Sequence, residues 1–227
     1  MKARIFLVTL FFIGAFILSS STNGFFNDVS ESKRNSVSLG KTFSVLSAAT
    51  SDHIVIHELL YDATEAQDIY KQAGKRRSQW VELYNPSRSS IDLSGWTIED
   101  SVGTKEAIKL SGTLSPRSFL LIINVSSSQF RKVWNVSPSA LLIETDFGRI
   151  GDGLDPLGDM LTLKDKNGVL VDKMSWGTIV SGFTSGCNAL CATAPTGASL
   201  ERAPVGNDTN SATDFFVKKN PTPGKGL

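Results

Sequence analysis

Beyond residue 53 the hydrophobic positions fall into short runs that are separated by turn residues. The runs that predict strands are, in chain order, Ile54–Leu60, Trp80–Tyr84, Ile91–Ile98, Phe119–Ile123, Met160–Leu163 and Val169–Met174. Between the last two lies Lys166-Asn167-Gly168, and an Asn-Gly pair between apolar runs favours a hairpin with a type I′ turn. Many short strands with such turn residues between them predict an all-β sandwich.

Two segments interrupt the strand pattern. Asp62 to Gly74 has helix-forming residues but only a weak apolar stripe, so we expect an exposed insertion that is helical or irregular. Further on, Ser128 is placed to cap a short helix. Phe130, Val133 and Trp134 would share one face of it. We expect this helix to lie over an open end of the sandwich, with its aromatic side chains in the core rather than on a ligand.

The N-terminus has the pattern of a secretory signal. Lys2 and Arg4 precede an apolar run, Ile5–Leu18, which small polar residues follow. The run is shorter than the ~20 apolar residues that a membrane-spanning helix needs. An uncleaved N-terminal anchor remains the alternative, and either arrangement predicts a secreted or cell-surface, extracytoplasmic protein. The expected organisation is a signal peptide at residues 1–24, a flexible linker rich in Ser and Asn at 25–51, and one domain at 52–227.

The charge balance argues against one class of partner. The chain carries 23 Lys and Arg against 22 Asp and Glu, a net charge of +1. Proteins that bind nucleic acid usually carry a basic excess, because phosphate neutralisation supplies much of their affinity, so we do not expect a nucleic-acid partner. One basic cluster would either contact an anionic partner or form a solvated loop: Lys71, Lys75, Arg76 and Arg77.

The two cysteines, Cys187 and Cys191, are separated by three residues in a stretch rich in Gly, Ser, Thr and Ala. In an oxidising compartment such a pair favours a local disulfide bond that pins a loop. Free thiols and metal ligation remain the alternatives. Closing so short a loop removes little entropy from the unfolded chain, so the bond would shape the loop more than stabilise the fold.

Glu58 and Glu82 lie on two predicted strands that could be neighbours. Paired carboxylates can share a proton or hold a cation, which offers a hypothesis of catalysis or metal binding. In the competing interpretation, which we favour, each glutamate accepts hydrogen bonds that support a corner of the sandwich. On a regular strand His57 would not join them, because successive side chains point to opposite faces.

Asp152, Asp155 and Asp159 lie in a Gly-rich loop, and oxygen ligands on such a loop suit Ca²⁺. Their spacing lacks the regularity of an EF-hand, and Asp-Gly pairs are also ordinary turn chemistry, so Ca²⁺ is the one cofactor we consider. His53 and His57 are the only histidines and would stand about 13 Å apart along a strand, too far to hold one ion. The sequence contains no Gly-x-Ser-x-Gly elbow and no phosphate-binding loop, so we expect no catalytic residues and no enzyme.

Five segments follow one another in a recognisable order. They are Ile54–Leu60, Trp80–Pro86 continued by Ile91–Trp96, Gly158–Leu163 continued through Asn167-Gly168 to Asp172, Ser199–Arg202 with Asp214-Phe215, and Pro221–Gly224. Together they resemble the lamin-tail domain family, of the prokaryotic exported type, over residues 52–226. The chain departs from the family's pattern at His57, where Asn is common, and in the longer Cys-bearing stretch at 179–197.

The resemblance implies an immunoglobulin-like β-sandwich that serves as an accessory or attachment module, with no defined reaction. Its motif residues have structural explanations. Gly95 suits a bend in a strand, Trp96 offers apolar surface to the core, and Asn85 satisfies backbone groups in a turn. The remaining motif residues are Glu58, Glu82, Glu201 and Arg202.

We therefore expect an immunoglobulin-like β-sandwich with one short helix and an irregular insertion. It would act as an exported, non-enzymatic binding or scaffolding module of the cell surface or extracellular space. Its partner would be an unidentified protein or cell-surface component, met at a sandwich edge or at the loops near residues 62–78 and 179–197. Membrane contact would require the N-terminal segment to stay uncleaved. The first alternative is a Ca²⁺-binding accessory module to a separately encoded hydrolase or nuclease, and a stand-alone metal-dependent hydrolase that uses Glu58 and Glu82 ranks last.

Overall fold

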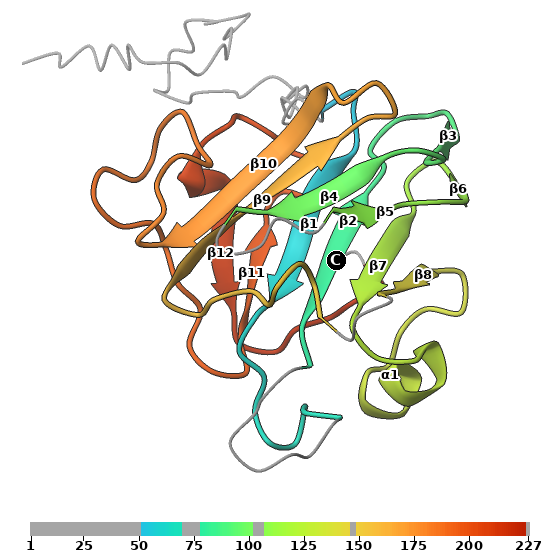
Figure 1. The fold of residues 1–227 in the computed structure, drawn as a ribbon, viewed down its shortest axis with the longest axis horizontal. Coiled ribbons are helices and arrows are strands. Elements are labelled where there is room, and N and C mark those ends of the chain that lie inside the picture. Colours follow the sequence, from blue (N-terminus) through green and yellow to red (C-terminus); the bar gives the residue numbers. More distant parts are fainter. Residues whose placement is uncertain (1–50, 70–77, 102–106, 146–148, 226–227) are drawn as a thin grey trace, which may run out of the picture. The chain divides into compact units, whose positions relative to one another are not determined.

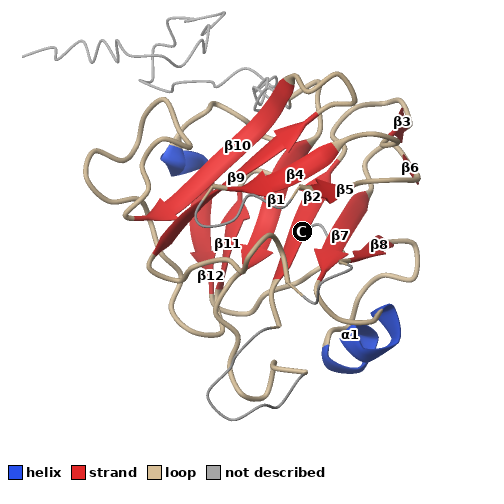
Figure 2. Cartoon of the chain, viewed as in Figure 1, coloured by secondary structure: helices blue, strands red, loops and turns tan. Residues whose placement is uncertain are grey.

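Two β-sheets packed against each other make up the fold (Figure 1, Figure 2). The computed structural model describes residues 51–69, 78–101, 107–145 and 149–225, all within one compact unit, Ser47–Leu227. One helix, α1 (Ser127–Val133), and a 3-10 turn at Ala212–Asp214 accompany the strands. The strands are β1 (Val55–Leu60), β2 (Trp80–Tyr84), β3 (Ile91–Asp92), β4 (Thr97–Asp100), β5 (Ile108–Lys109), β6 (Thr113–Leu114), β7 (Phe119–Ile123), β8 (Leu141–Glu144), β9 (Gly158–Lys164), β10 (Leu170–Gly177), β11 (Ser199–Arg202) and β12 (Phe215–Lys218).

The larger sheet has the strand order β12-β11-β1-β2-β7-β8, in which β7 and β8 run parallel and the other neighbours run antiparallel. The smaller sheet, β10-β9-β4-β5, is antiparallel. β3 and β6 form a separate two-stranded ribbon. The all-β, immunoglobulin-like sandwich predicted from the sequence is confirmed.

The core between the sheets is built from alternate residues of the strands. On β2, Val81 and Leu83 belong to this inner core, whereas Trp80 belongs to a second apolar cluster on the outer face of the larger sheet. This is the period of two that a strand imposes on its side chains. All three side chains are fully buried, so β2 is covered on both faces.

The outer face of the larger sheet is covered in part by α1. Phe130 and Trp134 pack there with Trp80, whereas Val133 is 39% exposed and does not share the buried face. The aromatic side chains therefore cover the outer face of the sheet and do not plug the space between the two sheets. The expectation that Phe130 and Trp134 are core residues is confirmed, whereas the expected position over an open end of the sandwich and the burial of Val133 are corrected.

The N-cap of α1 is Ser126, not Ser128. The Ser126 hydroxyl accepts a hydrogen bond from the Gln129 amide, and the Gln129 side chain accepts one from the Ser126 amide. This reciprocal pair is a capping box, which satisfies two backbone N–H groups that the first helical turn leaves unpaired. The capping box therefore places the start of the helix two residues earlier than the sequence prediction did.

The β9–β10 hairpin forms, but its turn is not the predicted type I′. That turn needs a positive φ at both central residues, and here Gly168 has φ +78° while Asn167 is not among the non-glycine residues with positive φ. The Gly168 amide donates to the Asp165 carbonyl, and the Asp165 side chain accepts from the amides of Asn167 and Val169. The hydrogen bonds to Asp165 thus stabilise a loop longer than the predicted two-residue turn, in which Gly168 has the left-handed conformation.

The predicted insertion is irregular where it is described. Residues 62–69 contain a turn at 65–67 and no helix. Its remainder, the basic cluster (Lys71, Lys75, Arg76 and Arg77), the predicted signal peptide and the linker up to residue 50 lie outside the described residues. Within the described ranges, no helix has the length and apolar character needed to cross a membrane.

Trp176 rather than Trp96 is the large tryptophan of the inner core. Trp176 is fully buried, stacks on Tyr61 with 5.0 Å between ring centroids, and donates from Nε1 to the Asp155 carbonyl. Trp96 is only partly buried and packs at the margin of the core. Its amide donates to the Leu93 carbonyl, so Trp96 lies at the end of the turn between β3 and β4 and not within a strand. The expectation that Trp96 offers apolar surface to the core is therefore confirmed, at the margin of the core rather than at its centre.

Candidate functional site

A β-bulge in β1 turns two successive side chains toward the outer face of the larger sheet. Ile56 pairs with Leu83 and Glu58 pairs with Glu82, so His57 is an extra residue on β1 that has no opposite number on β2. The His57 ring lies over the outer face, 5.4 Å from the Phe119 ring centroid. The expectation that His57 and Glu58 point to opposite faces is therefore wrong, because it assumed a regular strand.

Three buried glutamates lie side by side across this face. Glu58 on β1 is the register partner of Glu201 on β11 and of Glu82 on β2. Ser199 donates its hydroxyl to Glu58, and Lys218 donates to Glu201 with 2.6 Å between Nζ and Oε1. We call Glu58, Glu82 and Glu201 the glutamate row.

The C-terminal segment 219–225, which we call the strap, crosses the glutamate row. The Thr222 amide donates to Glu58 Oε1 at 3.3 Å, and the Gly224 amide donates to Glu82 Oε2. Gly224 has φ +74°, and a Cβ atom there would lie 2.7 Å from Cγ1 of Val136, so only glycine fits. The strap explains how Glu58 and Glu82 are used: each accepts a backbone hydrogen bond, as the favoured interpretation of the sequence required.

Four polar atoms beneath the strap have no hydrogen-bond partner among the described residues. They are both ring nitrogens of His57, Oε2 of Glu58 and Oε1 of Glu82. The Nε2 atom of His57 lies 3.9 Å from Oε1 of Glu82 and 3.8 Å from Oε1 of Glu201, beyond hydrogen-bond distance. Buried polar atoms without partners are rare in folded proteins and mark places where a proton or a small movement changes the energy.

Burial is the largest influence on ionisation in this cluster. It raises the pKa of Glu58 to about 7, and the hydrogen bond from Ser199 only partly opposes it. Burial likewise raises the pKa of Glu82 well above its ordinary range. Burial lowers the pKa of His57 to about 3, with Arg202 adding to the effect, so the imidazole is neutral near pH 7. Glu58 and Glu82 can therefore hold protons at a pH where exposed glutamates are ionised.

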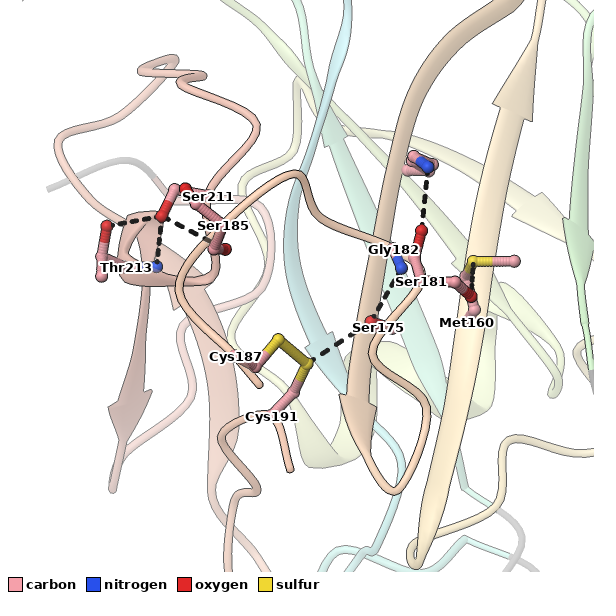
Figure 3. The surroundings of a disulfide bond; sticks show 10 residues. Met160, Ser175, Ser181, Gly182, Ser185, Cys187, Cys191, Ser211 and Thr213 are labelled. Carbon is pink, nitrogen blue, oxygen red and sulfur yellow. Dashed lines mark hydrogen bonds between the residues drawn. A yellow bond between two sulfur atoms is a disulfide. The ribbon is translucent and has the colours of Figure 1, made fainter. Parts of the chain in front are cut away.

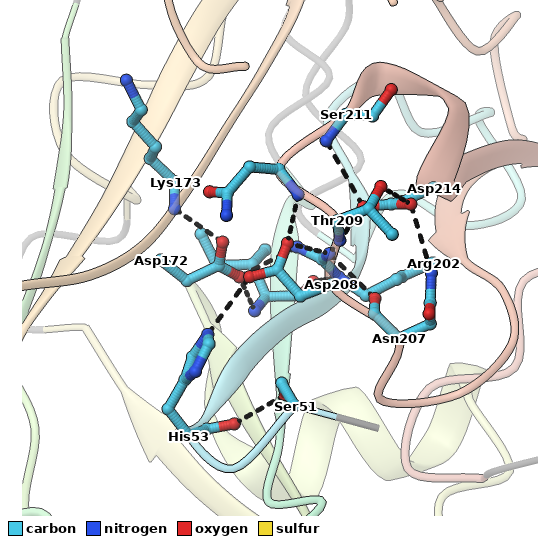
Figure 4. Close-up of polar contacts among 12 residues, drawn as sticks. Ser51, His53, Asp172, Lys173, Arg202, Asn207, Asp208, Thr209, Ser211 and Asp214 are labelled. Carbon is cyan, nitrogen blue, oxygen red and sulfur yellow. Dashed lines mark hydrogen bonds and ion pairs between the residues drawn. The ribbon is translucent and has the colours of Figure 1, made fainter. Parts of the chain in front are cut away.

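Arg202 forms a second buried cluster, on the inner side of β11 (Figure 4). The guanidinium group is 1% exposed and pairs with Asp172 of the opposite sheet at 2.9 Å, Asp208 at 2.9 Å and Asp214 at 3.4 Å. It also donates from Nε to the Ile56 carbonyl. Burial raises the pKa of Asp172 to about 6, against the attraction of Arg202. One cation thus joins β1, β10 and the loop between β11 and β12.

Cys187 and Cys191 form a disulfide bond with an S–S distance of 2.06 Å (Figure 3). The Cys191 amide donates to the Gly177 carbonyl at the end of β10, and Ser175 lies 3.6 Å from the Cys191 sulfur. The bond therefore closes a short loop that is fastened to β10, where it fixes the course of the chain between β10 and β11.

Two of the three aspartates considered for Ca²⁺ accept hydrogen bonds from neighbouring backbone amides. Asp159 accepts from the Met160 amide at 2.7 Å, and Asp155 accepts from the Leu157 amide. The backbone amide of Asp152 donates to Asp100 of β4. In the described part of the chain, no three His, Cys, Asp or Glu residues are placed so that they could hold a metal ion. The structure therefore does not bring Asp152, Asp155 and Asp159 together as a metal site.

Asn85 and Gly95 occupy turns. The Asn85 amide group donates to three carbonyls, including Ser89 at 2.8 Å and Leu114 at 3.1 Å, and its oxygen accepts from the Ser87 amide. Gly95 has φ +85°, a conformation that favours glycine. Both residues shape the chain around β3, as the structural interpretation of the motif expected.

A cavity of about 350 Å³ opens at the end of the sandwich where β1 and β7 finish, and no sequence motif predicted it. Gln79 lies on its wall, donating to the carbonyls of Tyr61 and Leu154 and accepting from the Leu154 amide. Gln79 thereby ties the loop before β9 to the start of β2. Side chains from distant segments line the cavity: Tyr61, Asp62, Asn124, Arg149, Asp152 and Asp155.

Comparison with family models identifies the family of the domain. Residues 47–178 match the model of the family described as Lamin Tail Domain. No curated protein matches the chain. The match ends with β10, so β11, β12 and the strap lie beyond it, although β11 pairs directly with β1.

Proposed function

The chain belongs to the lamin tail domain family, and we propose that it is an exported, non-enzymatic interaction module that binds a partner protein at the free edge of β12. An immunoglobulin-like protein-interaction module is what the family suggests at a coarse level. To this the proposal adds three points: binding at the edge of β12, export of the protein, and the absence of an enzymatic reaction.

The observation that carries the proposal is the exposed apolar edge of the larger sheet. β12 is the outermost strand, paired on one side with β11 and, among the described residues, with no strand on the other. Phe216 is 56% exposed and Val217 is 44% exposed, and as neighbours on a strand they point to opposite faces. Soluble proteins often protect such an edge with charges, proline or a bulge. The charged residue of β12, Lys218, is bonded to Glu201, so the exposed side chains of this strand are apolar, and such an edge can accept an added strand. An extended partner segment with apolar side chains at alternate positions fits this edge.

Two features support export. Lys2 and Arg4 ahead of the apolar run Ile5–Leu18 have the pattern of a secretory signal. The Cys187–Cys191 disulfide bond fits an oxidising compartment, where such bonds persist.

The non-enzymatic part of the proposal rests on how the polar candidates are used. Glu58 and Glu82 accept hydrogen bonds from the strap and are fully buried, so neither faces an open cleft where a substrate would bind. His57 is equally buried. Side chains that act on a substrate must reach it, and with the strap in place these do not.

Position-specific crosslinking in the native host tests the proposal. A photoreactive residue replacing Val217 in the full-length chain should form an adduct with one partner protein, and Phe216→Lys should lower its yield at least about tenfold. The matched control replaces Val169, a valine that is 59% exposed on the β9–β10 hairpin, and should give no such adduct. The same adducts from both positions, or none from position 217, would sink the proposal.

A further inference from the structure

The strap is built to present two hydrogen-bond donors to the sheet. It contains Pro221-Thr222-Pro223-Gly224, and proline has no backbone N–H, so the donors in this stretch are the amides of Thr222 and Gly224. These amides are two residues apart and bond to Glu58 and Glu82, which stand directly opposite each other on β1 and β2. The strap is therefore held to the sheet by hydrogen bonds to two adjacent carboxylates.

The charges beneath the strap do not balance when all the glutamates are ionised. Facing Glu58 and Glu82 are neutral His57 from β1 and Glu201 from β11. Among the described residues, the cation that acts on both is Lys218 of β12, and its ammonium group is already bonded to Glu201. Within this part of the chain, two buried negative charges would thus share the space with no cation of their own, an arrangement that low-dielectric surroundings disfavour strongly.

Other charged groups do not supply the missing cation. Arg202 lies on the inner side of β11 and is paired with Asp172, Asp208 and Asp214. The strap's own lysines, at positions 219 and 225, stand at its two ends rather than beside Thr222. Protonation is the means that remains for relieving the two carboxylates while the strap covers them.

We propose that the strap is a proton-controlled cover, which stays closed over the larger sheet while Glu58 and Glu82 hold protons and opens when both are ionised. Opening lets water reach the carboxylates and removes the desolvation that the closed strap imposes. It also exposes a groove floored by the glutamate row.

The direction of the pH dependence follows from linkage. In the closed state, the burial of both carboxyl groups raises their pKa by more than the amide hydrogen bonds from Thr222 and Gly224 lower it. The closed strap therefore keeps its full stability below the ordinary glutamate pKa of 4.5 and loses it as the pH rises. The loss from Glu58 is complete near its closed-state pKa of about 7, and the loss from Glu82 continues above that. Each group changes the opening equilibrium by at most about tenfold per pH unit.

Amide hydrogen exchange at Thr222 and Gly224, followed by NMR in the purified full-length chain, measures strap opening. Each rate is divided by the intrinsic rate of an unstructured peptide at the same pH, which leaves the opening constant. We expect this constant to rise at least about thirtyfold between pH 5 and pH 7. In a Glu58→Gln/Glu82→Gln variant it should stay constant, because glutamine accepts the same hydrogen bonds and does not ionise.

The control is Glu99→Gln, which removes a carboxylate that pairs with Lys164 on the smaller sheet and should leave the pH dependence of the strap intact. A wild-type opening constant that does not change with pH would overturn the proposal, whether or not the variants fold. So would a double variant that follows the wild type. The measurement needs no partner, so its outcome is independent of binding at β12.

Discussion

Truncation after Thr178, where the family match ends, is expected to abolish cooperative folding. The shortened chain lacks β11 and β12, so the larger sheet falls from six strands to four and β1 becomes an edge. It also loses inner-core side chains, among them Leu200 and Phe215, and the cation that Asp172 pairs with. Far-ultraviolet circular dichroism during heating should show no cooperative transition for this chain.

A chain that ends after Lys218 is the control for this truncation. It keeps every strand and loses only the strap, so it should melt cooperatively, at a lower temperature than the full chain because the outer face of the sheet is uncovered. Cooperative melting of the chain that ends at Thr178, close to the full-length value, would show that the last 49 residues do not belong to the folding unit.

Replacing Arg202 by methionine is expected to lower the free energy of unfolding by about 3–5 kcal/mol. The substitution keeps much of the side-chain volume but leaves Asp172, Asp208 and Asp214 around a site that no longer carries a positive charge. Asp172 is 1% exposed and lies between the sheets, so it cannot turn to water. Urea denaturation of the wild type and the variant measures the difference.

Arg88→Met is the matched substitution at an exposed position, and it should change stability by no more than about 0.5 kcal/mol. If Arg202→Met costs no more than Arg88→Met, the buried cation does not hold the two sheets and the loop after β11 together. An intermediate loss of about 1 kcal/mol would assign Arg202 the weight of an ordinary surface ion pair.

The longer strands were predictable because each contains a short run of apolar residues that is bounded by turn residues. β1, β2, β7, β9 and β10 follow this rule. β3, β5 and β6 have two residues each, too few to show a period. β11 and β12 were indicated only by the family resemblance. Ser199–Arg202 mixes polar and apolar residues that are all buried, so its sequence shows no pattern of buried apolar and exposed polar positions.

Parts of the site could not be predicted because their causes are not local. The bulge at His57 is set by the register between β1 and β2, and no residue type in this stretch predicts it. Trp96 and Trp176 are equally apolar, and only the packing of the sheets decides that Trp176 is the core residue. The contact of the strap with the glutamate row uses backbone amides, which leave no trace in the sequence beyond the spacing of its prolines.

One local signal was available. Ser126-Ser127-Ser128-Gln129 contains the Ser-x-x-Gln spacing of a capping box, which places the N-cap at Ser126. The prediction of Ser128 differs from this position by two residues, because Gln129 pairs with Ser126. Three consecutive serines are distinguished only by which of them lies three residues before an acceptor side chain.

Amide hydrogen exchange in β12, with and without the crosslinked partner, tests strand addition most directly. Strand addition predicts that those amides of Phe215–Lys218 that point away from β11 exchange more slowly in the complex, because they then donate hydrogen bonds to the partner strand. Exchange in the β9–β10 hairpin should be unchanged. Unaltered exchange in β12, with new protection confined to another surface, would contradict binding at this edge.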